Sequence, residues 1–249
     1  MTSTIRLGRI AGIPLGLHYS YFVLLALLTW RVSGAILPDR YTGWDSWVYW
    51  ATGAIAAILL SASVVLHELA HSLVARSRGI EVDGINLFIL GGVSELEADS
   101  RRARDEFLIA MVGPITSLLI SVILWGIASI LSGGNSPINA VIWYLGIVNL
   151  VLGIFNLLPV FPLDGGRVLR SVIWGISGSH GGATTAASIL GRVSGLGIMA
   201  LGVVWFVSGN YVGGVWLAFI GWFVQTAAKR SRFDAQDADE QRPRSELEP

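Results

Sequence analysis

The sequence contains no cysteine and only four histidines, namely His18, His67, His71 and His180, among its 249 residues. The absence of cysteine excludes disulfide bonds, thiolate zinc ligands and cysteine nucleophiles. Charged residues are also scarce: they make up 14% of the chain, whereas a soluble domain has about 25%. The formal net charge is zero, which gives no support to nucleic-acid binding.

Long apolar runs are what the sequence has in abundance. Mean hydropathy is +0.63, and runs of about 20 apolar residues, enough to cross a bilayer as a helix, recur along the chain. They predict an all-α polytopic membrane protein with six transmembrane helices. The expected spans are 13–36, 47–75, 107–131, 140–158, 188–207 and 211–228. The first run is too long for a signal peptide and lacks a clear cleavage site, so it is interpreted as a permanent span.

The segments outside these spans give further expectations. Residues 85–93 are too few to span as a helix, and their β-branched and aromatic content predicts a short strand or hairpin embedded in the membrane. Residues 1–12 are expected to form a short cytosolic lead, and 165–187 a glycine- and serine-rich loop. Residues 1–228 are interpreted as a single domain, and the polar tail 229–249 is expected to be disordered and cytosolic.

The distribution of basic residues predicts the orientation. With the N-terminus in the cytosol, 14 of the 17 basic residues fall in cytosolic segments. Only Arg31 and Arg40 lie on or near the outer side, and Arg192 lies near the inner end of the fifth span. Positive charge is retained on the cytosolic side of membrane proteins. We therefore expect a multi-pass protein of the plasma membrane with both termini in the cytosol.

The second span carries an H-E-x-x-H pattern at His67, Glu68 and His71. Residues four apart lie on the same face of a helix, so the two imidazoles can bind one ion while the glutamate handles a proton. The pattern alone is short and occurs by chance. Here all three residues lie in a run with no other charged residue, where a charged group is costly and marks function. The sequence therefore predicts a zinc site about 7–13 Å from the cytosolic end of the span.

A catalytic zinc ion usually has three protein ligands and an open position for water. Apart from Glu68, Asp164 is the sole acidic residue within the apolar runs and their breaks, and it follows a break at Pro159 and Pro162. Asp164 is therefore the candidate third ligand, although an Asp-Gly pair also suits a turn. His18, near the inner end of the first span, remains a competing candidate.

At these residues the sequence resembles the site-2 protease family of intramembrane zinc metalloproteases. The pattern at 67–71 is similar to the zinc motif of that family, and 156–167, N-L-L-P-V-F-P-L-D-G-G-R, to its N-x-x-P…L-D-G motif. Residues 88–93 resemble its Gly-Gly hairpin, and Gly113-Pro114 its Gly-Pro helix, where the glycine lets another helix approach closely. The resemblance covers about residues 10 to 170.

The resemblance implies particular roles for these residues. One zinc ion per chain is bound by His67, His71 and Asp164, and Glu68 is the general base. Asn156 binds the substrate or the oxyanion, and Gly91 and Gly92 pair with an unwound substrate. From the residues alone, Asn156 is equally a hydrogen-bonding residue between helices, and the two glycines a simple turn. Residues 76–106 and 229–249 are too short for the PDZ and CBS modules of many relatives, so either such modules do not regulate this protein or the chain has been shortened.

The resulting prediction is an intramembrane zinc metalloprotease that cleaves within or next to a transmembrane helix of a membrane-tethered regulator. Its partners are then a transmembrane substrate and the lipid bilayer. Three alternatives remain. A membrane-anchored zinc peptidase acting on cytosolic chains needs a soluble portion that these residues lack, and a zinc transporter needs polar residues along more spans. A catalytically silent zinc-binding scaffold is the third alternative.

Overall fold

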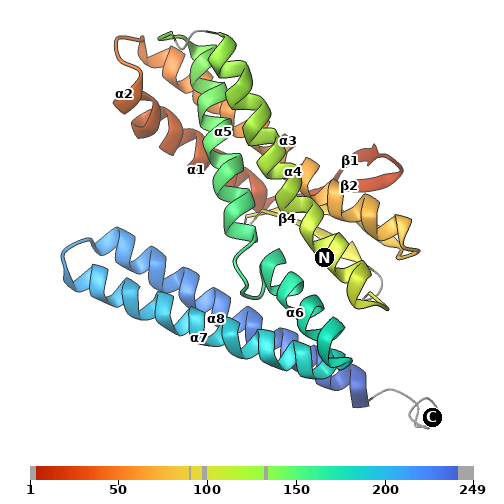
Figure 1. Cartoon of the computed structure of the whole chain (residues 1–249). Helices are drawn as coiled ribbons and strands as arrows, with labels where there is room; N and C mark the ends of the chain where they lie inside the picture. The colour runs from red at the N-terminus through yellow and green to blue at the C-terminus, as the bar shows by residue number, and fades with distance from the viewer. Residues whose placement is uncertain (1–3, 90, 97–99, 132–133, 241–249) are drawn as a thin grey trace. The chain divides into compact units, whose positions relative to one another are not determined.

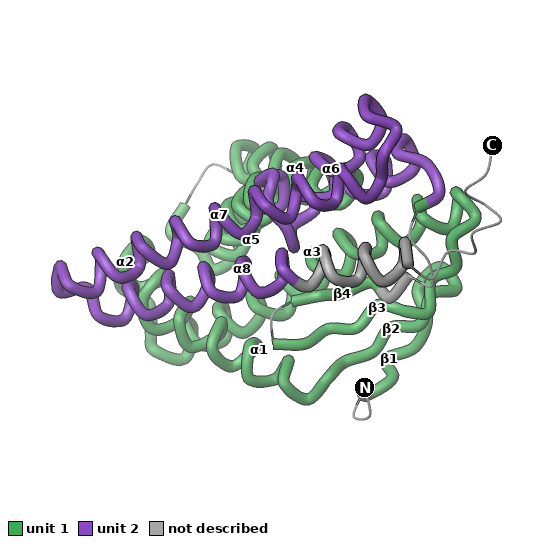
Figure 2. Tube along the Cα trace, turned by 90° about the horizontal axis from the view of Figure 1, so that it is seen from below, with its two compact units in different colours: residues 1–100, 112–155 green, residues 101–111, 156–249 purple. Residues whose placement is uncertain are grey.

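The computed structural model describes residues 4–89, 91–96, 100–131 and 134–240 (Figure 1). In chain order the elements are β1 (Thr4–Ile10), β2 (Ile13–His18), α1 (Ser20–Arg31), the π-helix η1 (Val32–Ile36), α2 (Leu37–Arg40), α3 (Ser46–Ser77), β3 (Val82–Phe88), β4 (Gly91–Leu96), α4 (Ala103–Ile130), α5 (Pro137–Asn156), α6 (Asp164–Ser177), α7 (His180–Val207) and α8 (Tyr211–Glu240). They group into two compact units, residues 1–100 with 112–155 and residues 101–111 with 156–249 (Figure 2). Helix α4 has residues in both.

The prediction of six membrane-spanning helices is confirmed for the described residues. The helices that are long and apolar enough to cross a bilayer are 20–40, 46–77, 103–130, 137–156, 180–207 and 211–229. α3 is the longest of them at 32 residues, about 48 Å, so it extends beyond a ~30 Å hydrocarbon core. Gly79, with φ +77°, ends this helix by adopting the left-handed conformation that favours glycine.

The first unit is a helical bundle with a sheet against one end. One core cluster packs η1 and α2 against α3 and α5 through buried residues that include Val32, Leu60 and Tyr144. A second cluster packs the sheet against α1 and α3, where Leu87 of β3 meets Tyr21 and Val65. Close approach of η1 to α3 is possible because position 53 is glycine: a Cβ there would lie 2.1 Å from the hydroxyl of Ser33.

The sheet has four strands in the order β1-β2-β3-β4, which is larger than the predicted strand or hairpin. The expectation for the N-terminus is wrong: residues 1–12 are not simply a lead, and the first span does not begin at Ile13. Ala11 and Gly12, with φ of 51° and 82°, form a two-residue turn that pairs β1 with β2. β2 then pairs in parallel with β3, and the spanning helix begins at Ser20.

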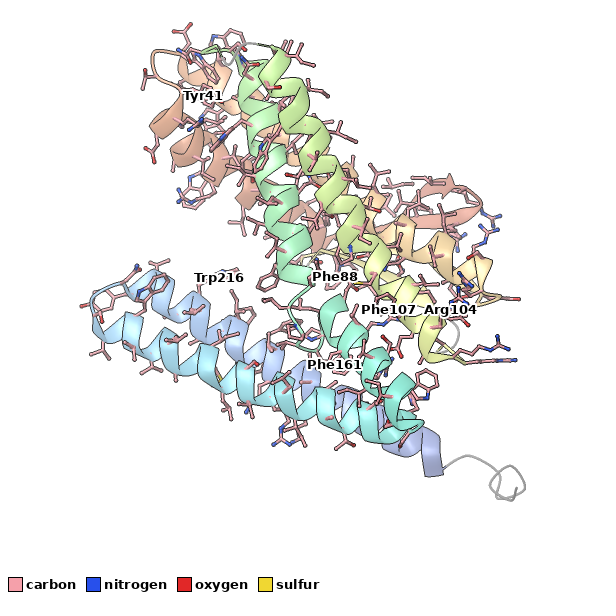
Figure 3. All side chains as sticks on the ribbon, in the orientation of Figure 1. Tyr41, Phe88, Arg104, Phe107, Phe161 and Trp216 are labelled. Atoms are coloured by element: carbon pink, nitrogen blue, oxygen red, sulfur yellow. The ribbon has the colours of Figure 1, made fainter. Side chains whose placement is uncertain are left out.

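In the second unit, α7 and α8 form a helical hairpin joined at residues 208–210 (Figure 1). Glycines bring their backbones into contact: a Cβ on Gly202 would lie 2.5 Å from the amide nitrogen of Ala218. Phe161, in the segment before α6, is 5% exposed and packs against Leu169 of α6 and against the hairpin (Figure 3). The unit therefore has its own core.

Two expectations for this unit differ from the structure. Residues 165–187 are not a loop, because Asp164–Ser177 forms α6, which ends at Gly178 with φ +71°, and α7 starts at His180. The tail is helical as far as Glu240, since no glycine or proline interrupts the chain between Gly221 and Pro243. Residues 241–249 lie outside the described residues, and the single domain 1–228 stays a prediction.

A buried ion pair connects two helices of the second unit. Arg170 of α6 donates from Nε to Glu106 of α4 at 2.6 Å, and Glu106 is fully buried. The Arg170 guanidinium also lies 5.5 Å from the centroid of the Phe161 ring. A buried pair of this kind is costly to break because one charge is then left without a partner.

Arg170→Gln should therefore lower the free energy of unfolding by about 3 kcal/mol or more, because it leaves the Glu106 carboxylate buried and uncompensated. The measurement is thermal unfolding of the purified protein in detergent. Arg192→Gln, at an exposed position of α7, is the matched control and should unfold like the parent. Equal unfolding midpoints for the two variants would contradict this role of the pair.

Candidate metal centre

The predicted metal-binding pattern lies on α3, inside the first unit. His67 and His71 are 4% and 5% exposed, and both side chains point to the same side of the helix, as their spacing requires. The two Nε2 atoms are 3.2 Å apart, and the ring planes are inclined at 73°. Two buried imidazole nitrogens thus meet at one point.

This spacing fits a zinc ion. Two ligand nitrogens bound to tetrahedral zinc at about 2.05 Å are about 3.3 Å from each other. The observed 3.2 Å is close to that value, so both imidazoles can bind one ion without rearrangement. Neutral imidazole is also a preferred zinc ligand.

Helix α4 closes one side of this point with a glycine. A Cβ on Gly113 would lie 2.1 Å from Nε2 of His71 and 2.8 Å from Nε2 of His67. The space beside both nitrogens is therefore open only because position 113 has no side chain. The expectation that this glycine permits close helix approach is confirmed.

Ser117, one turn further along α4, fixes the ring of His67. Its Oγ lies 2.9 Å from Nδ1 of His67, and the serine is fully buried. When Nε2 is the metal ligand, Nδ1 carries the proton and donates it to this hydroxyl. Such a contact sets both the tautomer and the orientation of a ligating imidazole.

Glu68 is held by serine hydroxyls from two elements. Ser94 of β4 donates to Glu68 Oε2 at 2.8 Å. Ser72, one turn along α3, donates to the carbonyl oxygen of Glu68 at 2.9 Å and lies 3.1 Å from Oγ of Ser94. The glutamate therefore does not project freely into the bilayer.

Gly91 and Gly92 begin β4. Gly91 has φ +124° and pairs with Phe88 at the hairpin end. A Cβ on Gly92 would lie 2.8 Å from Cγ of Glu68, so the strand passes directly over the glutamate. Within the described residues β4 pairs with β3 on one side only, which makes it an edge strand beside Glu68.

Two predicted residues belong to the second unit. Asp164 is the first residue of α6 and is half-buried, and Asn156 is the last residue of α5. Gly165 and Gly166 follow Asp164 because the helix start packs tightly on the preceding segment: a Cβ on Gly165 would lie 2.3 Å from the carbonyl oxygen of Leu157. The roles of Asp164 and Asn156 in the site stay predictions.

The other histidines have different surroundings. His18 ends β2, and its Nδ1 lies 2.7 Å from the hydroxyl of Ser20. His180 begins α7 and meets Trp174 edge to face, with ring centroids 4.7 Å apart. The serines that contact His67 and Glu68 were not predicted. A buried small polar residue in a span, such as Ser117, is a weak signal for such a role.

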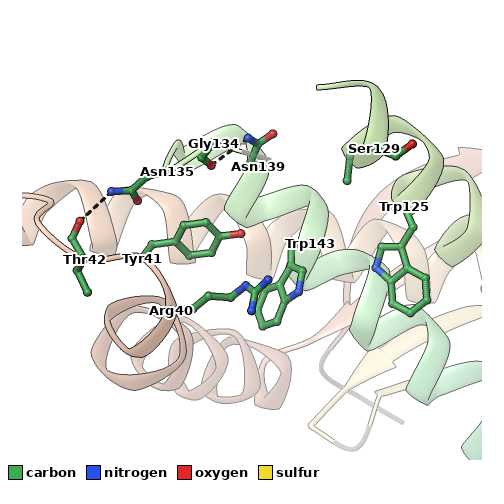
Figure 4. Close-up of a pocket in the computed structure, with 10 residues that line it drawn as sticks. Arg40, Tyr41, Thr42, Trp125, Ser129, Gly134, Asn135, Asn139 and Trp143 are labelled. Carbon is green, nitrogen blue, oxygen red and sulfur yellow. Dashed lines mark hydrogen bonds between the residues drawn. The ribbon is translucent and has the colours of Figure 1, made fainter. Parts of the chain in front are cut away.

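A cavity of about 730 Å³ is lined by residues of the first unit, among them Tyr41, Trp125 and Asn139 (Figure 4). Its lining includes Arg40, whose guanidinium lies 4.3 Å from the centroid of the Trp143 ring. Asn135 donates to the carbonyl of Thr42 nearby at 2.9 Å. His67 lies about 30 Å further along α3 than its first residue, so this cavity is not the metal centre.

Comparison with known proteins identifies relatives over most of the chain. The model of Peptidase family M50 matches residues 55–141 and 132–201. A putative zinc metalloprotease, Rip3 of Mycobacterium tuberculosis, is 45% identical over 231 residues, which are 92% of this chain and 58% of that protein. Putative zinc metalloprotease sll0528 of Synechocystis sp. is 38% identical over 238 residues, 95% of this chain and 62% of that protein. The chain thus spans about three fifths of the length of these curated relatives.

A solved structure also matches. The site-2 protease from Methanocaldococcus jannaschii aligns with a TM-score of 0.59 and 29% sequence identity, over 92% of this chain and 95% of that chain. The paired histidines and the adjacent glutamate lie within residues 55–201, which the family model matches. On these grounds the chain belongs to peptidase family M50, the site-2 protease family.

Proposed function

We propose that this chain is a zinc metalloprotease that hydrolyses a peptide bond within or next to a transmembrane helix of a membrane-tethered regulator. The observation that carries the proposal is the pair of buried imidazole nitrogens 3.2 Å apart, with Glu68 next to them in the sequence. The proposal is also supported by its relatives Rip3 and sll0528, which are named as putative zinc metalloproteases. We further propose that the protein is in the plasma membrane with both termini in the cytosol. The distribution of its basic residues supports this orientation.

His67, His71 and Asp164 would hold one zinc ion per chain. Two imidazole nitrogens and one carboxylate oxygen are a donor set typical of catalytic zinc. Asp164 starts α6, and the sequence around it is similar to the family motif. When bound, zinc would supply Lewis acidity, which lowers the pKa of a water molecule and polarises a substrate carbonyl.

Glu68 would accept a proton from the attacking water and deliver it to the leaving amine. A zinc transporter or scaffold has no need for a carboxylate held beside the histidines, so the bond from Ser94 to Glu68 favours the hydrolytic function over these alternatives. Asn156 would donate a hydrogen bond to the substrate or the oxyanion.

The substrate would meet the edge strand β4 near Gly91 and Gly92. Peptide bonds inside a helix are shielded by their own hydrogen bonds, so the segment to be cleaved must first become extended. An extended segment can pair with the free edge of a sheet. β4 has such an edge and lies over Glu68.

Glu68→Gln should abolish cleavage but leave zinc binding intact, because glutamine keeps the shape of the side chain and cannot accept the proton. The variant and the parent are each co-expressed with a panel of tagged single-span membrane proteins, and fragments are detected by immunoblotting. Zinc in the purified proteins is measured by mass spectrometry. Cleavage by Glu68→Gln at the rate of the parent would remove the glutamate from its role. Absence of cleavage by the zinc-loaded parent across the panel would count against the peptidase.

Asp164→Ala should weaken zinc binding by a factor of at least about 10, because one of three protein ligands is lost. Zinc affinity is measured by competition with a chelating dye on the purified protein in detergent. Asp83→Ala, at an exposed position on β3, is the control and should bind zinc like the parent. Unchanged affinity in Asp164→Ala would direct attention to His18 as the third ligand.

Gly113→Ala should also reduce zinc binding, since the added methyl group would occupy the space beside both Nε2 atoms. Gly126→Ala is a matched control on the same helix, because a Cβ at that position meets nothing within 4 Å. Zinc stoichiometry and thermal stability are compared for both variants. Full zinc occupancy in Gly113→Ala would show that the ion does not bind at the meeting point of the two imidazoles.

A further inference from the structure

The hydrogen bond from Ser94 to Glu68 links two elements that are distant in the sequence. Ser94 lies on β4, 26 residues after Glu68 on α3, and its Oγ is 2.8 Å from the carboxylate oxygen Oε2. The same Oγ is 3.2 Å from the carbonyl oxygen of Glu68. A hydroxyl has only one proton, so it can donate to only one of these two acceptors at a time.

The contacts of the neighbouring Ser72 are compatible with donation from Ser94 to the carboxylate. Ser72 Oγ can donate to the Glu68 carbonyl at 2.9 Å, as a serine often does to the residue four positions earlier in a helix. Ser72 Oγ also lies within donating distance of Ser94 Oγ, at 3.1 Å. Whether Ser72 donates to the carbonyl or to Ser94, the proton of Ser94 remains available for the carboxylate. A bond to an ionised carboxylate is stronger than one to a neutral carbonyl, which favours the same arrangement.

The strand backbone adds a second constraint. Side chains alternate along a strand, so positions 92 and 94 face the same side of β4. At position 92 the absence of a side chain leaves room for Glu68, since a Cβ there would lie 2.8 Å from Cγ of Glu68 and 3.1 Å from Cγ1 of Val64. The contact at Gly92 limits the stem of Glu68, and the bond from Ser94 orients its end.

We propose that Ser94 is a positioning residue for Glu68, which keeps the carboxylate in the orientation needed for proton transfer. Because Ser94 is part of β4, it also holds the general base in a fixed place relative to the strand that would receive the substrate. The proposal rests on the proposed function, in which Glu68 is the base and the edge of β4 binds an extended segment. Ser94 would act only through Glu68, whose carboxylate it orients.

The test compares Ser94→Thr with Ser94→Val. The two replacement side chains are almost equal in shape, both suit a strand, and only threonine keeps the hydroxyl. In Ser94→Val we expect kcat to fall by about 10- to 100-fold through misplacement of the base, with KM and zinc content unchanged. Ser94→Thr should keep most of the parent activity. The probe is a single-span substrate that the parent cleaves, reconstituted with the purified enzyme in vesicles.

A control and a second measurement separate this role from a general effect on folding. Ser77→Ala, in the last turn of α3, removes an exposed hydroxyl that donates to the Val74 carbonyl, and its kcat should equal that of the parent. The zinc content of purified Ser94→Val is measured beside its kcat and should equal that of the parent, whereas a general loss of folding would lower both.

Equal activities of Ser94→Thr and Ser94→Val, whether both high or both low, would overturn the proposal, as would a loss that appears in KM alone. The proposed function would instead be contradicted if the zinc-loaded parent cleaved no substrate, or if Glu68→Gln were as active as the parent. The two failures are therefore distinguishable.

Discussion

Polar groups on α3 lie in an otherwise apolar spanning helix, and each needs a partner because an unpaired polar group in hydrocarbon is costly. The structure meets this requirement with serines. Ser117 from α4 contacts His67, and Ser94 from β4 contacts Glu68. Both partners come from elements later in the chain, so they reach α3 only after the bundle has folded. The position of every reactive group in the first unit therefore depends on how α4 and β4 pack against α3.

Glycine makes that packing close enough for the short serine side chain to reach. A Cβ at Gly113 would displace both histidines, and one at Gly92 would displace Glu68. At both places the backbone of the neighbouring element, rather than a side chain, forms the wall of the site. Such a wall is rigid because it belongs to a helix or a strand. The same rigidity means that even one added methyl group is expected to disturb the metal centre or the base.

The sequence was sufficient to predict the six spans and the meeting of His67 with His71, because both follow from local periodicity and hydropathy. The sequence was not sufficient to predict the four-stranded sheet. β2 pairs with β3 across a helical hairpin of more than sixty residues, and the apolar run from Ile13 reads equally as part of a helix. Likewise, nothing local distinguishes Ser94 from other serines. The role of Ser94 depends on a contact between segments that are distant in the sequence. Such contacts can be identified only in the folded structure.

The proposed use of β4 explains why a sheet edge and a general base belong together in a membrane. Extending a helical segment in hydrocarbon frees amide and carbonyl groups, each of which then costs several kcal/mol unless it finds a partner. The free edge of β4 offers such partners in the plane of the sheet. The side chains of a strand project perpendicular to that plane, and there Gly92 and Ser94 meet Glu68. One strand can therefore bind an extended substrate through its backbone while its side chains hold the base, because the two roles use different directions.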